Sequence, residues 1–237
     1  MWSISDIQAV NTMPEEFNWM TDNGLAVYVH NNVLPNLLRW HGPTSSGIIL
    51  DFGCGTGETT NTLSDLFNCR VIGIDIDRHN VRRKGEFVIC SGSFLPFIDN
   101  TFSSAFCLGV LHHIPGWGTA LKEIQRTLNN NGLVVGNEPN ALHPHMSNMP
   151  LLNKIADAIV KTGERAIDYR TLTAAFKDSG FTVKEMRSTL GLKFLSTPIE
   201  FILRGKQTYP VYLLMEKIDF MIPFMFRSNI SFCLVKV

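Results

Sequence analysis

Three glycines at alternate positions are the residues of this chain that point most directly to ligand binding. They are Gly53, Gly55 and Gly57, which follow the apolar run Ile48–Phe52. A helical pattern begins directly behind them at Glu58. Glycines let a backbone turn sharply and approach a ligand closely, and a helix N-terminus offers free N–H groups to an anion such as a carboxylate. A strand, a glycine loop and a helix in this order predict a binding loop, and the alternative is a glycine-rich turn without a ligand.

Two aspartates indicate what this loop binds. Asp51 lies two residues before the first glycine, and Asp75 ends the apolar run that starts at Val71. A carboxylate can accept two hydrogen bonds, which suits the two hydroxyl groups of a ribose, so Asp75 indicates a nucleoside. The alternative role for such an acid is to cap a helix, and Asp77 is the better candidate for that role. The glycine spacing differs from the GxGxxG pattern of nicotinamide-binding loops, so an NAD-dependent oxidoreductase is the less favoured alternative.

Four ionisable residues are candidates for moving a proton at such a site, namely His112, His113, Glu138 and His143. Imidazole titrates near neutral pH. Glu138 follows an apolar run, which would place it at the carboxyl end of a parallel strand, where such sheets bind ligands. The two adjacent histidines could equally belong to the start of a helix. The spacing of Glu138, His143 and His145 matches no recognised metal-ligand pattern and the cysteines do not cluster, so no metal site is predicted.

The segment Asp51–Gly57, with the sequence DFGCGTG, resembles the first motif of the class I S-adenosylmethionine-dependent methyltransferases, in particular the type 11-like members. The resemblance implies that this loop wraps the methionine end of S-adenosylmethionine and that Asp51 helps to hold the amino group of the cofactor. Asp75 would bind its ribose. The implied chemistry is methyl transfer by in-line displacement, for which the protein mainly positions the reactants.

The segment Ser91–Phe102 resembles a second motif of the family, GDAxxLPFxDxxFD, with two departures. Ser91 stands where the family has an acid near the adenine amino group, and Ser103 stands where it has the later acid. The hydroxyl of Ser91 or Ser93 would then hydrogen-bond the base. The missing acids also allow an alternative function, that of a methyltransferase-like protein that binds a ligand without catalysis.

Other residues complete the expected cofactor site. Ile76 and Phe94 would sandwich the adenine ring, although both could equally belong to the core. Phe106–Pro115, which contains the two adjacent histidines, resembles the family's segment after the fourth strand, and its backbone near Leu108 and Gly109 would pass the methionine end. The full set expected at the cofactor is Asp51, Gly53, Cys54, Gly55, Gly57, Asp75, Ile76, Ser91, Gly92, Ser93, Phe94 and Leu108.

Short apolar runs alternate with helical patterns from residue 47 onward, which predicts a parallel sheet with crossover helices. The predicted strands are Ile48–Phe52, Arg70–Ile74, Phe87–Cys90, Ser104–Leu108, Leu133–Asn137, Thr182–Arg187 and Ser231–Val237. The predicted helices are Glu58–Phe67, Trp117–Leu128, which Asn129–Gly132 would stop, and Tyr169–Ser179. We expect an α/β fold with a Rossmann-like, doubly wound seven-stranded sheet that is mostly parallel. The family resemblance implies that the last strand is antiparallel.

We expect residues 1–237 to form a single methyltransferase domain. Its expected parts are a helical lead-in or lid (1–46), a cofactor-binding core (47–140) and a substrate-side half that holds the last two strands (141–237). Two inserts, Ala141–Ile167 and Ser188–Ser228, interrupt the alternation, and the second is rich in large apolar side chains. An apolar insert favours a hydrophobic or lipid-linked acceptor.

The balance of charge argues against some classes of partner. The chain has 21 basic and 21 acidic side chains, so it lacks a general attraction to nucleic acid, and no nucleic-acid partner is expected. The five cysteines are odd in number and unclustered, as in reduced proteins of the cytosol. Met1–Val10 lacks the pattern of a signal peptide, and charges and prolines interrupt Tyr209–Phe226. We therefore expect a cytoplasmic protein without a transmembrane segment.

These observations together predict an enzyme of small-molecule biosynthesis. The expected reaction is the transfer of a methyl group from S-adenosylmethionine to a small-molecule acceptor, with a hydroxyl group favoured over an amine. The proton of that hydroxyl would pass to one of the four ionisable candidates named above.

Overall fold

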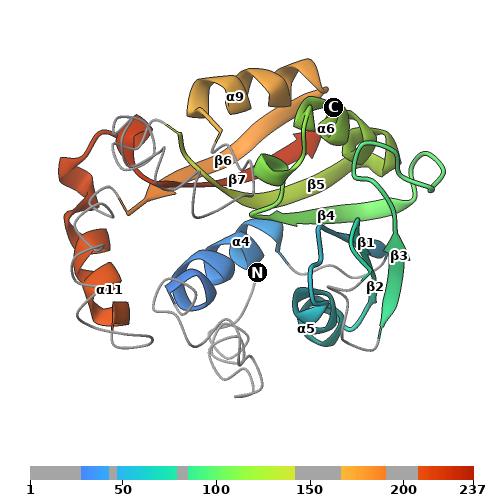
Figure 1. Ribbon diagram of the computed structural model, residues 1–237, viewed down its shortest axis with the longest axis horizontal. Coiled ribbons are helices and arrows are strands. Elements are labelled where there is room, and N and C mark those ends of the chain that lie inside the picture. Colours follow the sequence, from blue (N-terminus) through green and yellow to red (C-terminus); the bar gives the residue numbers. More distant parts are fainter. Residues whose placement is uncertain (1–27, 43–46, 79–84, 142–166, 191–207) are drawn as a thin grey trace.

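Seven strands form one sheet in the computed structural model, which describes residues 28–42, 47–78, 85–141, 167–190 and 208–237. The strands are β1 (Ile48–Phe52), β2 (Arg70–Asp75), β3 (Glu86–Ile89), β4 (Phe102–Leu108), β5 (Leu128–Pro139), β6 (Phe181–Thr189) and β7 (Asn229–Lys236). Their order in the sheet is β3-β2-β1-β4-β5-β7-β6. β7 runs antiparallel to β5 and β6, whereas the other neighbours are parallel (Figure 1). The predicted fold class is thereby confirmed.

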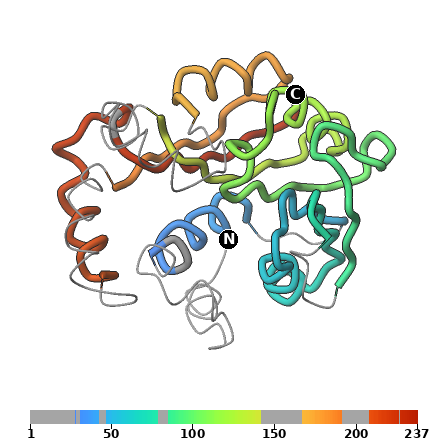
Figure 2. The backbone as a smooth tube through the Cα atoms, in the orientation of Figure 1, coloured from blue at the N-terminus to red at the C-terminus, as the bar shows by residue number. Residues whose placement is uncertain are grey.

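Helices cover both faces of this sheet (Figure 2). The described helices are α4 (Leu34–His41), α5 (Glu58–Phe67), α6 (Trp117–Thr127), α9 (Tyr169–Asp178) and α11 (Tyr209–Ile218), with the short turns η1 (Val29–Val33), η2 (Leu111–His113), η5 (Asp219–Met221) and η6 (Phe224–Phe226). Leu50 of β1 packs with residues of α6 and α9, and its neighbour Ile49 packs with residues of α4, α5 and α11. Because successive residues of a strand point to opposite faces, one apolar run contributes to both cores.

The strand β5 begins five residues earlier than the sequence predicts. The preceding helix ends at Thr127, and Leu128 is already extended and pairs with Phe102 of β4. Asn129–Gly132, which were expected to stop the helix, lie inside the strand, where Asn131 has a φ of 61°. The register of β4 and β5 shifts beside Phe102. The residues that tolerate a left-handed conformation therefore accommodate a β-bulge and not a helix end.

The chain reverses its direction of growth across the sheet at β1. β2 and β3 lie on one side of β1, and β4 and β5 lie on the other. Such a switch point leaves a crevice at the carboxyl ends of the flanking strands, where open α/β sheets bind ligands. The loops that follow β1 and β4 both leave the sheet at this place, so the topology predicts where a site lies before any side chain is considered.

The undescribed residues include 142–166 of the first predicted insert, 191–207 of the second, and 1–27 and 43–46 of the expected lead-in. The part of the second insert that the structure describes contains α11, whose Tyr212 and Met215 pack on the sheet. Leu214 on the same helix is exposed. None of the described helices has the length and apolar character needed to cross a membrane.

A partly buried histidine, His41, at the end of α4 attaches that helix to the sheet. The ring of His41 packs against Phe67 of α5 and Phe106 of β4, with centroids 4.8 and 5.2 Å away. Its Nδ1 lies 2.7 Å from the carbonyl oxygen of Gly42, and its Nε2 lies 2.8 Å from the hydroxyl of Ser104. A neutral ring satisfies both contacts, because Nδ1–H donates to the carbonyl and Nε2 accepts from the hydroxyl. Burial lowers the pKa of His41.

We expect acid to weaken the folded state through His41. The unfolded histidine titrates near about pH 6.5, so below that pH the unfolded state takes up a proton that the buried ring resists. The free energy of unfolding should fall by up to about 1.4 kcal/mol per pH unit until the folded pKa is reached. His41→Leu removes this contribution. The difference in urea-unfolding free energy between the wild type and His41→Leu should therefore shrink from about pH 7 to about pH 5, and a constant difference would contradict the buried neutral ring.

Candidate functional site

The crevice at the switch point is a pocket of about 690 Å³. Four segments line it, namely the end of β1 with the glycine loop, the end of β2, residues 90–93 and residues 109–115. Each segment follows the carboxyl end of a parallel strand. The volume is that of a small-molecule site, so the sheet brings distant parts of the chain to one binding cavity.

The glycine loop lies directly on the end of β2. The N–H groups of Gly53 and Cys54 both donate to the carbonyl of Ile74, at 2.9 and 2.8 Å. Gly53 has a φ of +76°, and a Cβ on it would stand 2.2 Å from the side chain of Val110. Only a glycine therefore allows the loop after β4 to pack this closely against the loop after β1. Gly55 has a φ of +52° and lines the pocket, and a Cβ on it would have no atom of the described residues within 4 Å beyond Gly55 itself and its two chain neighbours.

The two aspartates occupy different positions relative to the pocket. Asp75 lines it, and its Oδ2 and Oδ1 accept from the N–H groups of Gly55 and Asp77, both at 2.9 Å. Each oxygen keeps a second lone pair, which leaves Asp75 able to accept from two further hydroxyls. Asp51 is 2% exposed and does not line the pocket, and its Oδ2 accepts from the hydroxyl of Thr60 at 2.6 Å. Burial raises the pKa of Asp51 to about 7, because the charged carboxylate would be poorly solvated there.

Of the residues expected at the adenine, all except Phe94 line the pocket. Ser91, Gly92 and Ser93 line it. The hydroxyl of Ser91 accepts from the N–H of Ser93 at 3.2 Å, and its carbonyl accepts from the N–H of Phe94 at 3.0 Å. Ile76 also lines the pocket, whereas Phe94 does not. Their side chains are 75% and 76% exposed, so the alternative that they belong to the core is wrong.

Three more residues of the expected cofactor set do not line the pocket, namely Cys54, Gly57 and Leu108. Cys54 is buried under the loop, and Gly57 forms the left-handed N-cap of α5. The pocket-lining residues that the sequence analysis missed are Phe52, Ile74, Cys90, Val110, Ile114 and Pro115. Their shared signal is a position at or just beyond the carboxyl end of a strand, but apolar residues in such positions have the same sequence pattern as core residues.

Glu138 at the end of β5 is fully buried. Its Oε1 accepts from the N–H groups of Val110 and Leu111, at 3.0 and 2.8 Å. Its Oε2 lies 2.7 Å from Nδ1 of His112 and 3.4 Å from the N–H of the same residue. A carboxylate only accepts, so Nδ1 of His112 carries the hydrogen. Glu138 thus ties the turn η2 to β5 and fixes the orientation of the His112 ring.

Three of the four candidates for moving a proton lie together. The ring of His112 packs against that of His113, with the ring centroids 3.9 Å apart. His113 is exposed and lines the pocket, whereas Glu138 does not reach it. His143 lies outside the described residues. The arrangement therefore separates a histidine that faces the cavity from a buried carboxylate that holds its neighbour.

Comparisons with known proteins agree with this geometry. Residues 50–136 match a family model described as a methyltransferase domain. An uncharacterized protein of Methanocaldococcus jannaschii is 37% identical over 89 residues, which are 37% of this chain and 39% of that protein. An O-methyltransferase of Penicillium expansum is 29% identical over 153 residues, which are 60% of this chain and 54% of that protein. The chain thus spans about half the length of these curated relatives or less.

A solved structure shares the fold over most of its length. An S-adenosylmethionine-dependent methyltransferase from Mesorhizobium loti superposes on the chain with a TM-score of 0.64. The match covers 85% of this chain and 96% of that one, at 13% sequence identity. At this identity the likeness concerns the fold alone.

Gly55→Ala is expected to weaken the binding of S-adenosylhomocysteine by at least about tenfold, which is about 1.4 kcal/mol. The added methyl group would enter the pocket and would also strain a left-handed backbone. Gly116→Ala is the matched control, because Gly116 has a φ of +69°, has equally open surroundings and lies outside the pocket lining. Calorimetry on both variants decides the matter. Equal affinities would show that Gly55 does not face the ligand.

The raised pKa of Asp51 predicts a stability that falls with rising pH. Between about pH 4 and pH 7 the folded state keeps a proton that the unfolded state has lost, so the free energy of unfolding falls by up to about 1.4 kcal/mol per unit. The side chain of Asp51→Asn cannot ionise. The free energy of unfolding of this variant, measured with urea, should therefore rise relative to that of the wild type between about pH 4 and pH 7. Asp65→Asn removes an exposed carboxyl of α5 and serves as the control. Parallel curves for the wild type and Asp51→Asn would exclude a buried, protonated Asp51.

Proposed function

We propose that the chain is a class I S-adenosylmethionine-dependent methyltransferase, which its match to the methyltransferase-domain model over residues 50–136 supports, and that it transfers a methyl group from S-adenosylmethionine to a hydroxyl group of a small molecule. The observation that carries the proposal is the pocket at the switch point, where the glycine loop, Asp75 and His113 line one cavity. The proposal treats the chain as one domain, with residues 47–140 as the part that binds the cofactor.

The pocket fits the cofactor in size and in the groups that it offers. Gly55 leaves open space where any other residue would place a side chain. Asp75 has lone pairs left for the hydroxyls of a ribose, and Ser91 and Ser93 offer hydroxyls to a base beside the exposed side chain of Ile76. When bound, S-adenosylmethionine supplies a methyl group on a sulfonium centre that the protein does not have to activate. The chain's own residues therefore bind the cofactor, orient it toward the acceptor and exclude water from the site.

A hydroxyl acceptor loses a proton as it is methylated, and in this proposal His113 takes that proton. His113 lines the pocket, and its ring packs on that of His112. Glu138 is buried with both oxygens engaged by donors. In this proposal Glu138 therefore orients His112 and does not meet the acceptor itself, so that His113 is the general base.

The surroundings of His113 favour an acceptor with an apolar body. Val110, Ile114 and Pro115 line the pocket beside it, which supports a hydrophobic or lipid-linked molecule. The relative named as an O-methyltransferase supports a hydroxyl group as the acceptor. The equal numbers of basic and acidic side chains support a small molecule over a nucleic acid. All five cysteines are free thiols, which supports a cytoplasmic location and a role in biosynthesis there.

The cofactor assignment is tested by calorimetry with S-adenosylhomocysteine and NAD in separate titrations. We expect binding of S-adenosylhomocysteine and none of NAD. Tight binding of NAD without the other ligand would overturn the proposal in favour of an oxidoreductase.

The chemistry is tested with methyl-labelled S-adenosylmethionine and hydroxylated acceptors graded in apolar character from catechol to a sterol. His113→Ala should lower turnover by about 10²–10⁴-fold and leave the affinity for S-adenosylhomocysteine nearly unchanged. Glu138→Gln should lower turnover less, because it acts through His112. Near-normal turnover in His113→Ala would place the base elsewhere, with His143 as the next residue to replace, and transfer to amines alone would exclude the hydroxyl acceptor.

A further inference from the structure

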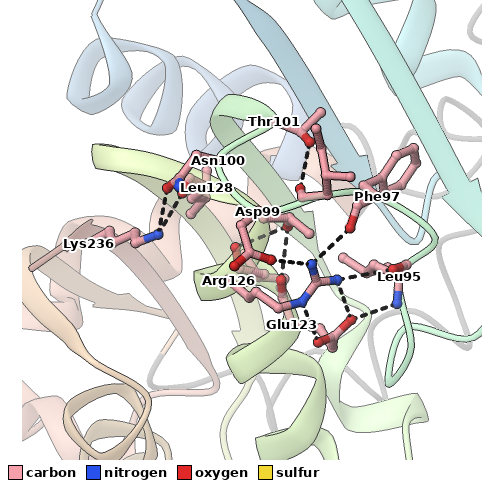
Figure 3. A network of polar contacts seen from close by, with 12 residues as sticks. Leu95, Phe97, Asp99, Asn100, Thr101, Glu123, Arg126, Leu128 and Lys236 are labelled. Carbon is pink, nitrogen blue, oxygen red and sulfur yellow. Dashed lines mark hydrogen bonds and ion pairs between the residues drawn. The ribbon is translucent and has the colours of Figure 1, made fainter.

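The guanidinium of Arg126 on α6 is the centre of a polar network that holds the segment after the adenine side of the pocket (Figure 3). Its Nε donates to Oε1 of Glu123 at 2.9 Å, and one terminal nitrogen donates to the carbonyl of Phe97 and to Asp99, at 2.8 and 2.7 Å. The other terminal nitrogen donates to the carbonyl of Leu95 and to Oε2 of Glu123, at 3.1 and 2.9 Å. The five N–H donors of an arginine are thus matched by five acceptors.

The hydrogen bonds of Arg126 and Glu123 to backbone groups contribute more to holding this segment than the ion pair between Arg126 and Asp99 does. Asp99 is 67% exposed, and an ion pair in water contributes little. Glu123 and Arg126 are 18% and 32% exposed, and hydrogen bonds from Arg126 hold the pKa of Glu123 below its usual value. A charged Glu123 accepts the N–H of Leu95 at 2.8 Å. Leu95, itself buried, is therefore held by both of its backbone polar groups.

The far end of the same segment is also fixed. The N–H of Asn100 donates to the carbonyl of Arg126 at 3.2 Å, and that of Thr101 donates to the carbonyl of Thr127 at 2.7 Å. Lys236 of β7 donates to the side-chain oxygen of Asn100 at 3.1 Å (Figure 3). Residues 95–101 are thus attached to α6 at both ends and to β7 at the far end, so they form a support for the segment before them.

The pocket wall formed by Ser91–Ser93 continues directly into this support. The hydrogen bonds within residues 91–94 join Ser93 and Phe94 back to Ser91, so they shape the turn but do not attach it to the rest of the fold. Leu95 is the next residue along the chain and is the anchor made by Glu123 and Arg126. Neither of these two residues lines the pocket, so any influence on a ligand acts through the loop.

We propose that Glu123 and Arg126 are positioning residues for the nucleoside part of the cofactor, because they hold Leu95 and thereby set the place of the wall Ser91–Ser93. This inference rests on the proposed binding of S-adenosylmethionine. Its consequence is selective. Loss of the anchor weakens every ligand that carries the nucleoside by a similar factor, whether or not the ligand has the methionine part, since the glycine loop is left in place.

The test compares Arg126→Gln with Arg70→Gln. Arg70 at the start of β2 makes a similar two-pronged ion pair with Glu86 of β3; the two side chains are 54% and 52% exposed, and neither residue lines the pocket. We expect Arg126→Gln to weaken S-adenosylhomocysteine and 5′-methylthioadenosine alike by about tenfold, measured by calorimetry well below the unfolding temperature. In the ligand-free protein, amide hydrogen exchange across residues 91–101 should accelerate in Arg126→Gln and remain unchanged in Arg70→Gln.

Glu123 provides a milder pair of variants that remain informative if Arg126→Gln does not fold. Glu123→Gln keeps an oxygen that can accept from the N–H of Leu95 and should retain more affinity than Glu123→Ala. Equal affinities and equal exchange in Glu123→Ala, Glu123→Gln and the wild type would overturn the inference. So would a loss confined to S-adenosylhomocysteine, because the methionine end would then be affected. A wild type that fails to bind either ligand would overturn the proposed function itself.

Discussion

The close passage of the glycine loop over the end of β2 is the constraint on which the site depends. Two successive N–H groups share the carbonyl of Ile74, and Gly53 lies against Val110 with no room for a side chain. This contact joins the loops after β1 and β4 to the end of β2, so three of the four segments that line the pocket are linked directly to one another. The N–H of Gly55 bonds to Asp75 and extends the same contact to the residue proposed to bind the ribose.

Two buried carboxylates support these loops from below. Asp51 bonds to Thr60 under the glycine loop, and Glu138 gathers the N–H groups at the start of η2 together with His112. Burying a carboxylate is costly unless hydrogen bonds compensate for the lost water. The cost is met differently at the two residues. Glu138 accepts hydrogen bonds from several donors, whereas the pKa of Asp51 is raised to about 7, which favours its uncharged form. Both are better understood as groups that hold the site than as groups that contact a ligand.

The division between a pocket wall and its support recurs on the adenine side. Ser91–Ser93 line the cavity, and α6 holds Leu95, two residues further along the chain, through side chains that do not line the pocket. Such an arrangement separates the residues that recognise a ligand from those that set their geometry. Ser91, which stands where the resembling family has an acid, takes part in the turn by accepting the N–H of Ser93, whereas the attachment of the following segment to α6 is made by Glu123 and Arg126.

The sequence by itself determined the α/β fold, the glycine loop and the place of Asp75, because strand and helix periods, glycines and strand ends are local properties of the chain. Only the tertiary structure decided that Asp51 lies beneath the loop, that Ile76 is exposed, and that Glu138 holds His112 while His113 faces the pocket. Each of these facts depends on contacts between residues far apart in sequence, such as the 26 positions that separate Glu138 from His112. A local pattern shows that Glu138 lies at the end of a strand. The donors that it contacts belong to the loop after the neighbouring strand β4, and only the tertiary structure brings them there.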